Sequence, residues 1–181
     1  MLKKRELVEC TELFELLSNP TVFPYVRQKA TSADEYWFMT KQLMEEEAAG
    51  TAVSRTIIDD WNQVIGTISL FDIQEGAGFL GTWIGEPFQG KGYNQRAKHD
   101  FLSELFFELD FHTVFLRIRV ENIKSQRAAM KLPYVVEANE SHPTLLQQIN
   151  ANGNEFKLYQ IPRDLFYMVA AQTANEEVVA M

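Results

Sequence analysis

A glycine-bearing loop between a predicted strand and a predicted helix is the segment best suited to chemistry. It covers residues 85–92 and reads GEPFQGKG, and a helical pattern starts near Tyr93. Glycine has no Cβ, so the backbone of such a loop can come close to a ligand. Its N–H groups and those of the next helix can then converge on an anion, usually phosphate. The loop therefore predicts an anion-binding site.

Two common nucleotide motifs fit this loop poorly. Residues 85–91 have the G-x-x-x-x-G-K spacing of a P-loop, but Gly92 stands where that motif needs Ser or Thr to hold magnesium. The strands before the loop are predicted to form an antiparallel hairpin, whereas a P-loop follows a parallel strand. A dinucleotide fingerprint starting at Gly90 would need its third glycine at Gln95. A magnesium-dependent nucleotide hydrolase is therefore disfavoured.

The hydrophobic periodicity predicts a mixed α+β sheet with helices around it. Ser32 and Glu35 have capping-box spacing at the start of one helix. Asn122 is a plausible N-cap of another. The predicted strands cover residues 5–9, 51–58, 64–72, 79–84, 113–120, a short stretch near 135, and 156–161. The predicted helices cover residues 11–17, 32–48, 93–109 and 122–131.

Charge is distributed unevenly along the chain. The formal net charge is −8, which argues against general nucleic-acid binding. Residues 89–131, however, contain eight Lys or Arg and five Asp or Glu, so this stretch has a net charge of +3 and the remainder −11. This basic island contains the second half of the glycine loop and two predicted helices. It indicates a local site for an anionic ligand or, equally, chance clustering on a solvated face.

Length and composition limit the class of protein. The 181 residues, 46% of them hydrophobic, predict a single domain over residues 1–172, followed by a frayed tail over 173–181. No apolar run approaches the ~18 residues of a membrane-spanning helix, and the N-terminus lacks a secretory pattern. Cys10 is the only cysteine, so an internal disulfide is excluded, and the three histidines have no metal-ligand spacing. We expect a cytoplasmic protein without a metal.

The loop also resembles a third phosphate motif. Residues 89–94, QGKGYN, resemble the Q/R-x-x-G-x-G/A loop of the GNAT acyltransferase superfamily, which holds the coenzyme A pyrophosphate. The whole run 80–93 is similar to the strand and loop of Rim-type (ribosomal-protein N-terminal) acetyltransferases. Further similar segments follow the family's order along most of the chain: residues 13–20, 120–125, 131–134 and 152–153.

This resemblance implies a GNAT fold with two splayed central strands and acetyl-CoA as cosubstrate. It implies transfer of acetyl to a primary amine, either a protein N-terminal α-amino group or a small amine, by direct attack on the thioester. Ser125 matches the Rim-type serine that protonates the departing thiolate. The protein would be a monomer or a homodimer. The implied coenzyme-binding residues are Trp83, Ile84, Gln89, Gly90, Lys91, Gly92, Tyr93, Asn94, Asn122 and Lys131.

The chain departs from the family at several chemically important positions. Asn94 replaces a small residue, Pro133 replaces a glycine, and Phe79 and Ala129 occupy positions where relatives carry an acid or a tyrosine. The general base therefore stays open, with Asp72, Glu75 and Glu86 as candidates at predicted strand ends. The empty positions also allow a second function, a coenzyme A sensor or scaffold that performs no chemistry. Trp61, in a predicted turn, could contact an acceptor or a partner subunit.

Overall fold

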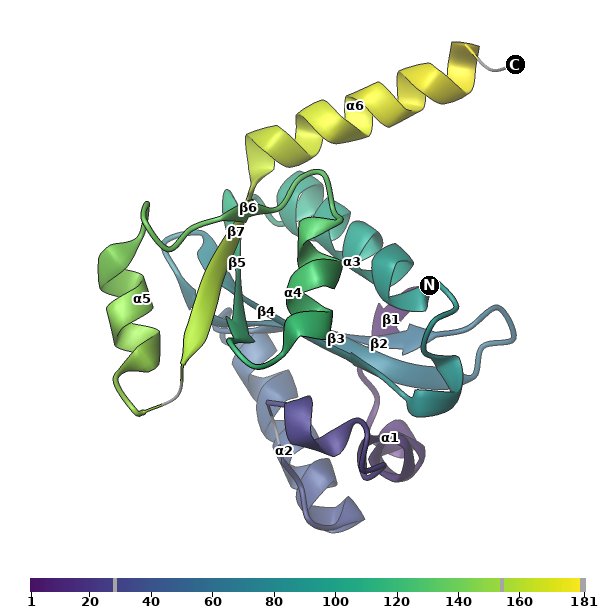
Figure 1. Ribbon diagram of the computed structural model, residues 1–181. Coiled ribbons are helices and arrows are strands. Elements are labelled where there is room, and N and C mark those ends of the chain that lie inside the picture. Colours follow the sequence, from purple (N-terminus) through teal and green to yellow (C-terminus); the bar gives the residue numbers. More distant parts are fainter. Residues whose placement is uncertain (28, 154, 180–181) are drawn as a thin grey trace. The chain divides into compact units, whose positions relative to one another are not determined.

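The computed structural model describes residues 1–27, 29–153 and 155–179, with side chains described as far as residue 172. Its strands form a mostly antiparallel seven-stranded sheet in the order β1-β2-β3-β4-β5-β7-β6 (Figure 1). The predicted α+β class is confirmed. The strands are β1 (Leu2–Lys4), β2 (Val53–Ile58), β3 (Val64–Gln74), β4 (Ala77–Ile84), β5 (Thr113–Arg119), β6 (Val136–Glu137) and β7 (Phe156–Pro162). The α-helices are α1 (Cys10–Leu17), α2 (Ala33–Ala48), α3 (Tyr93–Ser103), α4 (Ile123–Met130), α5 (Pro143–Asn150) and α6 (Arg163–Val179).

The chain divides into two compact units, which are described separately below. Unit 1 comprises Met1–Gln74 and Leu80–Leu109, and unit 2 comprises Glu75–Phe79 and Asp110–Met181. The prediction of one domain over residues 1–172 stays a prediction. The backbone of α6 is helical to Val179, where a frayed tail was expected from residue 173, and residues 180–181 lie outside the description.

Unit 1 is built on the predicted hairpin of β2 and β3. The two strands pair antiparallel, with Val53 opposite Leu70 and Thr56 opposite Thr67. The register shifts by one residue at Ile57 and Ile58, next to the turn. All six residues of β2 are buried, as expected of a strand covered on both faces.

The first strand was predicted at the wrong residues. Instead of residues 5–9, β1 is Leu2–Lys4, which pairs antiparallel with β2 at the edge of the sheet, and Leu7–Glu9 form a 3₁₀ turn. The physical reason is that Arg5 turns inward, where its Nη2 donates to Tyr36 Oη (3.2 Å) and Thr40 Oγ1 (3.1 Å) on α2.

Helices α1 and α2 contribute to an apolar cluster of unit 1, called here the α1–α2 cluster. The cluster contains Cys10, which is 2% exposed, and packs against the partly buried ring of Trp83. The predicted N-cap of α2 is confirmed because Ser32 Oγ accepts a hydrogen bond from Glu35 N (3.1 Å). The Glu35 carboxylate reaches one residue further than a capping box requires and accepts from Thr31 N and Oγ1, both at 2.6 Å.

The predicted helix over residues 93–109 is regular only in its first part. α3 ends at Ser103, and a π-helical turn covers Glu104–Glu108. Of the predicted apolar stripe, Ala97, Phe101 and Leu105 are buried, but Leu109 is 44% exposed. Leu109 lies beyond the π-helical turn, where the α-helical repeat no longer applies, so it leaves the buried face.

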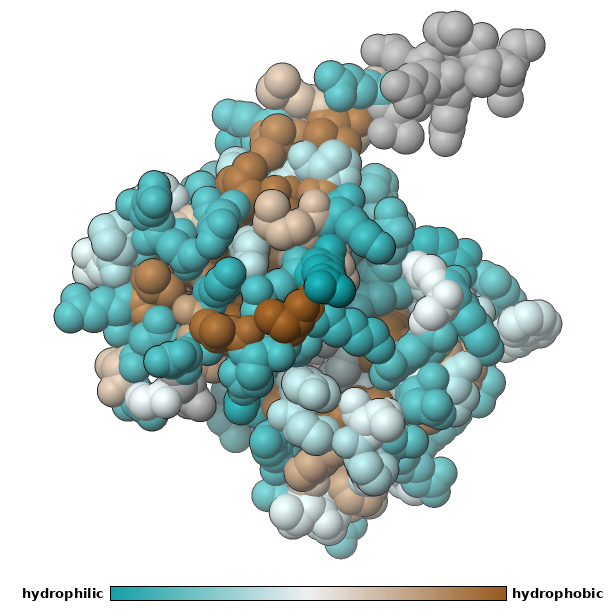
Figure 2. All heavy atoms as spheres, viewed as in Figure 1, coloured by the Kyte–Doolittle hydropathy of each residue, from teal (hydrophilic) through white to brown (hydrophobic). Residues whose placement is uncertain are grey.

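The surface of the described chain is mainly polar. On the face shown in Figure 2, hydrophilic side chains predominate and apolar ones form small separate patches. The most exposed large apolar side chains in the described part are Val8 (86%), Trp61 (80%) and Phe38 (66%). No helix in the described part is long and apolar enough to cross a membrane.

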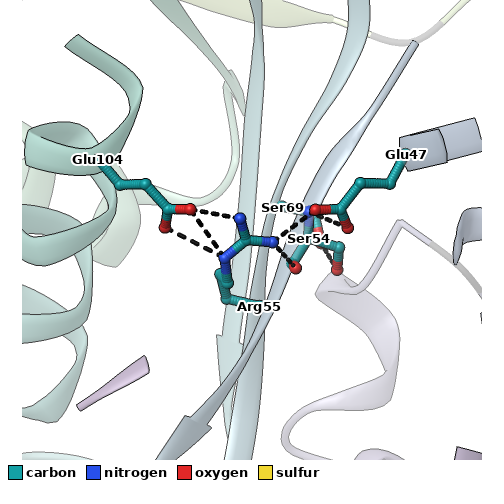
Figure 3. Close-up of polar contacts among 5 residues, drawn as sticks. All are labelled: Glu47, Ser54, Arg55, Ser69 and Glu104. Atoms are coloured by element: carbon teal, nitrogen blue, oxygen red, sulfur yellow. Dashed lines mark hydrogen bonds and ion pairs between the residues drawn. The ribbon is translucent and has the colours of Figure 1, made fainter. Parts of the chain in front are cut away.

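A buried arginine connects β2 to two helical segments of unit 1 (Figure 3). Arg55 Nη1 donates to Glu47 Oε1 of α2 (2.6 Å), and its Nε donates to Glu104 Oε1 (3.0 Å) in the π-helical turn. Although burial alone would lower it, hydrogen bonds to Glu104 and Glu47 raise the pKa of Arg55 above its ordinary value. The arginine therefore stays charged and holds the end of α3 against the sheet.

Unit 2 contains the rest of the sheet. The first residues of β4 pair parallel with β5, with Phe79 opposite Phe115, and β5 pairs antiparallel with β7 along its whole length. Phe79, Phe115, Ala138 and Leu158 form a buried cluster, against which the apolar side chains of α5 pack. Beyond Phe79, the residues of β4 belong to unit 1.

Two helices of unit 2 were missed. Both α5 and α6 lie in segments for which no helix was predicted (Figure 1). α5 has only eight residues, and His142 at its N-cap makes no side-chain capping bond, so its start signal is weak. α6 contacts β7, and its Phe166 ring meets Tyr134 edge to face at 5.0 Å between centroids.

Candidate functional site

The loop after β4 is folded back onto the end of that strand. A 3₁₀ turn covers Glu86–Phe88, and Gln89 N donates to Glu86 O (3.1 Å). The Gln89 side chain also points back, because its Nε2 donates to Ile84 O (3.0 Å). Gln89 was predicted to bind the coenzyme; in this structure its amide holds the loop in shape.

Gly90 and Gly92 have the backbone conformation that favours glycine. Their φ angles are +76° and +83°. A Cβ built on either residue would meet no heavy atom within 4 Å. The protein itself therefore leaves open space above both glycines, and their special role lies in the left-handed backbone.

The backbone N–H groups at the end of this loop and the start of α3 have no partner among the described residues. Among the described residues, no N–H of residues 90–95 donates to another protein group, and Gly92 caps α3 without a side-chain bond. The N-terminus of a helix carries a partial positive charge. Lys91 is exposed beside them, with its Nζ 5.6 Å from the centre of the Phe88 ring. These unpartnered donors and this cation have the chemistry that an anion-binding surface needs.

The end of β4 approaches β3 unusually closely. A Cβ on Gly66 would lie 2.2 Å from Trp83 O, so only glycine fits there. Gly85 N donates to Ile65 O (2.8 Å), which anchors the start of the loop. Ile84 is buried, and the Trp83 ring packs against the α1–α2 cluster. Sequence reasoning missed Gly66, because nothing in its local sequence shows which strand crosses it.

The first turn of α3 presents further polar groups. Tyr93 is buried, and the Arg96 guanidinium lies over its ring at 4.9 Å from the centroid. Arg96 Nη1 is also 3.6 Å from Asp60 Oδ1 in the β2–β3 turn. Asn94 is exposed, so its side chain points away from the core of unit 1.

Within unit 2, Asn122 and Ser125 lie together at the start of α4. Asn122 Oδ1 accepts a hydrogen bond from Ser125 N (3.1 Å), which confirms the predicted N-cap. Gln126, which sequence reasoning missed, is buried and donates from Nε2 to Arg119 O (3.0 Å) and Val120 O (2.7 Å). These amide bonds fix the turn between β5 and α4.

The Ser125 hydroxyl is not used by the helix. In the described part of the chain Ser125 Oγ has no hydrogen-bond partner, although the residue is half-buried. By contrast, Ser103 Oγ in α3 donates to His99 O (2.9 Å), the usual local bond of a helix serine. Lys131 lies at the exposed end of α4.

One candidate general base is already paired. Asp72, at the end region of β3, accepts two hydrogen bonds from Arg27, at 2.8 and 3.0 Å. Glu86 is exposed in the loop. Among the residues that the structure describes, no three His, Cys, Asp or Glu side chains are grouped to hold a metal ion.

A lysine on α3 has an unusual pKa. The side chain of Lys98 is half-buried, and loss of solvation lowers its pKa to about 8. A lysine is normally protonated up to about pH 10. The Lys98 ammonium group therefore lowers the stability of the folded protein while it is charged.

The structure thus brings the predicted site residues together in two groups. Ile84 and residues 89–94 are contiguous at the end of β4 and the start of α3, and Asn122 and Ser125 share the start of α4. Each group belongs to a different unit.

Comparisons with solved structures show similar folds. Spermidine N-acetyltransferase from Vibrio cholerae, in complex with CoA and spermine, aligns with a TM-score of 0.73 at 18% identity, over 92% of this chain and 97% of the other. A Vibrio cholerae protein described as a "putative ribosomal-protein-serine acetyltransferase" aligns with a TM-score of 0.70 at 16% identity, over 89% and 92%. No curated protein sequence matches the chain significantly.

The family assignment comes from the sequence itself. The family model described as "Acetyltransferase (GNAT) domain" matches residues 3–135, which is more than half of the chain. Enzymes of this family use acetyl-CoA, and the resemblance noted from the glycine loop is confirmed. This chain belongs to the GNAT acetyltransferase family.

Proposed function

We propose that this protein transfers the acetyl group of acetyl-CoA to a primary amine. The observation that carries the proposal is the loop over residues 90–95, whose backbone N–H groups have no partner among the described residues. Gly90 and Gly92 hold these donors in place and leave open space above them. Two adjacent phosphate groups need several donors and little steric bulk, which is what this loop provides.

Residues on both sides of the loop would complete coenzyme binding. Lys91 would add a positive charge near the pyrophosphate. The backbone of Trp83 and Ile84 would pair with the pantetheine arm, as the family resemblance implies. Thr82 Oγ1 is buried on the same strand without a partner among the described residues, and an amide of that arm could supply one. Asn122 and Lys131, which belong to unit 2, are further coenzyme-binding candidates that the family resemblance implies.

Ser125 is the proposed proton donor. After the amine attacks the thioester carbonyl, the C–S bond breaks and the sulfur leaves as a thiolate. The Ser125 hydroxyl, which has no partner among the described residues, would donate its proton to that thiolate and take one back from solvent water. The amine must lose a proton, and we propose water leading to a carboxylate as its route. Asp72 would have to release Arg27 to act as that carboxylate.

The acceptor is a primary amine, either small or at a protein N-terminus. The spermidine acetyltransferase and the protein described as a "putative ribosomal-protein-serine acetyltransferase" resemble the fold of this chain to a similar degree. The experiment described below therefore includes both classes of acceptor. Outside residues 89–131 the chain has a net charge of −11, which favours a cationic acceptor.

The second candidate function is a coenzyme A sensor without chemistry. It is favoured by the pairing of Asp72 with Arg27, which leaves that carboxylate engaged. The two candidates differ in a single observable, because a sensor binds acetyl-CoA and releases no thiol.

The deciding experiment measures acetyl-CoA binding and then thiol release. Calorimetry should show binding that weakens with salt, because phosphates contribute to it. Acetyl-CoA at one hundred times its Kd should stabilise the fold by about 2.7 kcal/mol. Thiol release is then followed with spermidine, spermine, simple monoamines and peptides with free N-termini. Turnover with any of them supports the enzyme. Binding with no turnover supports the sensor, and no binding at millimolar acetyl-CoA contradicts both.

A further inference from the structure

The turn between β2 and β3 carries a solvent-exposed tryptophan. Trp61 is 80% exposed, although indole is among the largest apolar side chains. Among the described residues, the α1–α2 cluster does not include it. Aromatic rings of this size contribute strongly to binding when they become covered. Trp61 is therefore available to a ligand with a flat apolar face.

The backbone beneath Trp61 is fixed in advance. Asp59 is buried, and its Oδ1 accepts from both Trp61 N and Gln63 N, each at 2.9 Å. Asp59 N donates to Gln63 O (3.0 Å), which closes the turn. A ring on a rigid turn loses little conformational freedom when a ligand covers it, so the turn is preorganised for contact.

The same turn is tied to the anion-binding loop. Asp60 Oδ1 lies 3.6 Å from Arg96 Nη1, and Arg96 N donates to Gly92 O (3.1 Å). Figure 1 shows the β2–β3 turn next to the segment that leads into α3. The turn that carries Trp61 is therefore next to α3, whose N-terminal loop would bind the phosphate groups. The ion pair with Arg96 also offsets the negative charge that Asp60 would otherwise present to them.

We propose that the indole of Trp61 stacks on the adenine ring of coenzyme A. This inference rests on the proposed function, since it needs the pyrophosphate on residues 90–95. In coenzyme A one ribose separates the adenine from the pyrophosphate, so the base lies one sugar away from that loop. Stacking on a purine needs only a flat aromatic face, which Trp61 offers at the edge of the loop.

The test compares the affinities of full-length variants for ligands with and without the base. The ligands are acetyl-CoA, its dephospho form, which keeps adenine and lacks the 3′-phosphate, and S-acetyl-4′-phosphopantetheine, which lacks the adenosine, the 3′-phosphate and one phosphate of the pyrophosphate. Trp61→Ala should raise the Kd for acetyl-CoA and for its dephospho form about tenfold, equivalent to about 1.4 kcal/mol. It should leave the Kd for S-acetyl-4′-phosphopantetheine unchanged. Trp61→Phe should recover part of the loss. Phe38→Ala removes another exposed ring, from α2, and should change nothing.

Each other result overturns the inference. An unchanged acetyl-CoA Kd in Trp61→Ala, with normal binding by the parent protein, rejects the stacking alone and leaves the proposed function in place. An equal loss for all three ligands means that Trp61 only shapes the turn. A loss for acetyl-CoA but not for its dephospho form assigns the effect to the 3′-phosphate. Failure of the parent protein to bind acetyl-CoA rejects the proposed function and the stacking together.

Discussion

Gly92→Val tests whether phosphate groups bind over the start of α3. Gly92 has φ +83°, and a Cβ there meets nothing within 4 Å. Gly50, after the end of α2, has nearly the same setting, with φ +77° and no atom within 4 Å. Gly50→Val is therefore a matched control, because it imposes the same backbone strain away from the loop.

The two substitutions should cost the same stability. A left-handed conformation costs an L-residue roughly 1–2 kcal/mol, and a β-branched residue lies at the upper end, so we expect about 2 kcal/mol for each. Binding should separate them. The new side chain at Gly92 would occupy the space of a phosphate and break at least one N–H bond to it. A hydrogen bond to a charged group is worth about 1.5–3 kcal/mol, so the Kd for acetyl-CoA should rise about 10- to 150-fold.

Urea unfolding measures the loss of stability in each variant. Calorimetry with acetyl-CoA, supported by the KM, measures the rise in Kd. The reasoning is refuted if folded Gly92→Val binds acetyl-CoA as the parent protein does. It is also refuted if Gly50→Val loses as much affinity, since the effect would then come from strain alone.

Three further substitutions test the roles assigned to Ser125, Lys98 and Arg55. Ser125→Ala should lower kcat about ten- to a hundredfold, or 1.4 to 2.7 kcal/mol, and change stability by no more than ~1 kcal/mol, because a thiolate of pKa near ~8.5 leaves fairly well unaided; steady-state kinetics and urea unfolding check this. Lys98→Met should stabilise the fold by about 1–2 kcal/mol at pH 7, a value reduced for the partial exposure of the side chain. The unfolded chain binds this proton more tightly, so the gain is full below the folded pKa of about 8 and disappears as the pH rises towards 10.5; unfolding curves from pH 6 to 10.5 check this. Arg55→Met should cost about 2–3 kcal/mol in urea unfolding, because it leaves the half-buried Glu47 and Glu104 without their shared cation.

Matched controls exist for these substitutions. Ser103→Ala removes a helix hydroxyl that bonds only to its own helix, and it should leave kcat unchanged. Arg119→Met breaks an exposed pair with Glu121 (3.6 Å) and should cost under about 0.5 kcal/mol. A near-normal kcat in Ser125→Ala would show that water protonates the thiolate. A pH-independent effect of Lys98→Met would show that its ammonium group is solvated.

Local sequence was enough to predict the elements that lead to the loop. The β2–β3 hairpin follows from β-branched alternation around a polar turn, and the start of α2 follows from Ser32. The loop itself was predictable because Gly90 and Gly92 take positive φ angles that few other residues tolerate. Asn122 caps α4 as its position indicated.

The errors come from contacts that local sequence does not contain. Arg5 sits inside unit 1 because Tyr36 and Thr40, more than thirty residues away, accept its hydrogen bonds, so the first strand had to end earlier. Gly66 is required by a strand that follows later in the chain. The Gln89 amide bonds to Ile84 O, a contact that the motif does not reveal, while its coenzyme-binding role stays a prediction.

The burial of Cys10 has a practical consequence for chemistry with thiol reagents. It is the only cysteine in the sequence and is 2% exposed within the α1–α2 cluster. A buried thiol reacts slowly, so a colorimetric reagent for free thiols will report coenzyme A release with little background from the native protein. In the absence of substrate, the same reagent can be used to measure local unfolding through the rate at which it labels Cys10. It can label Cys10 only when α1 opens, and the labelling rate then gives the free energy of that opening.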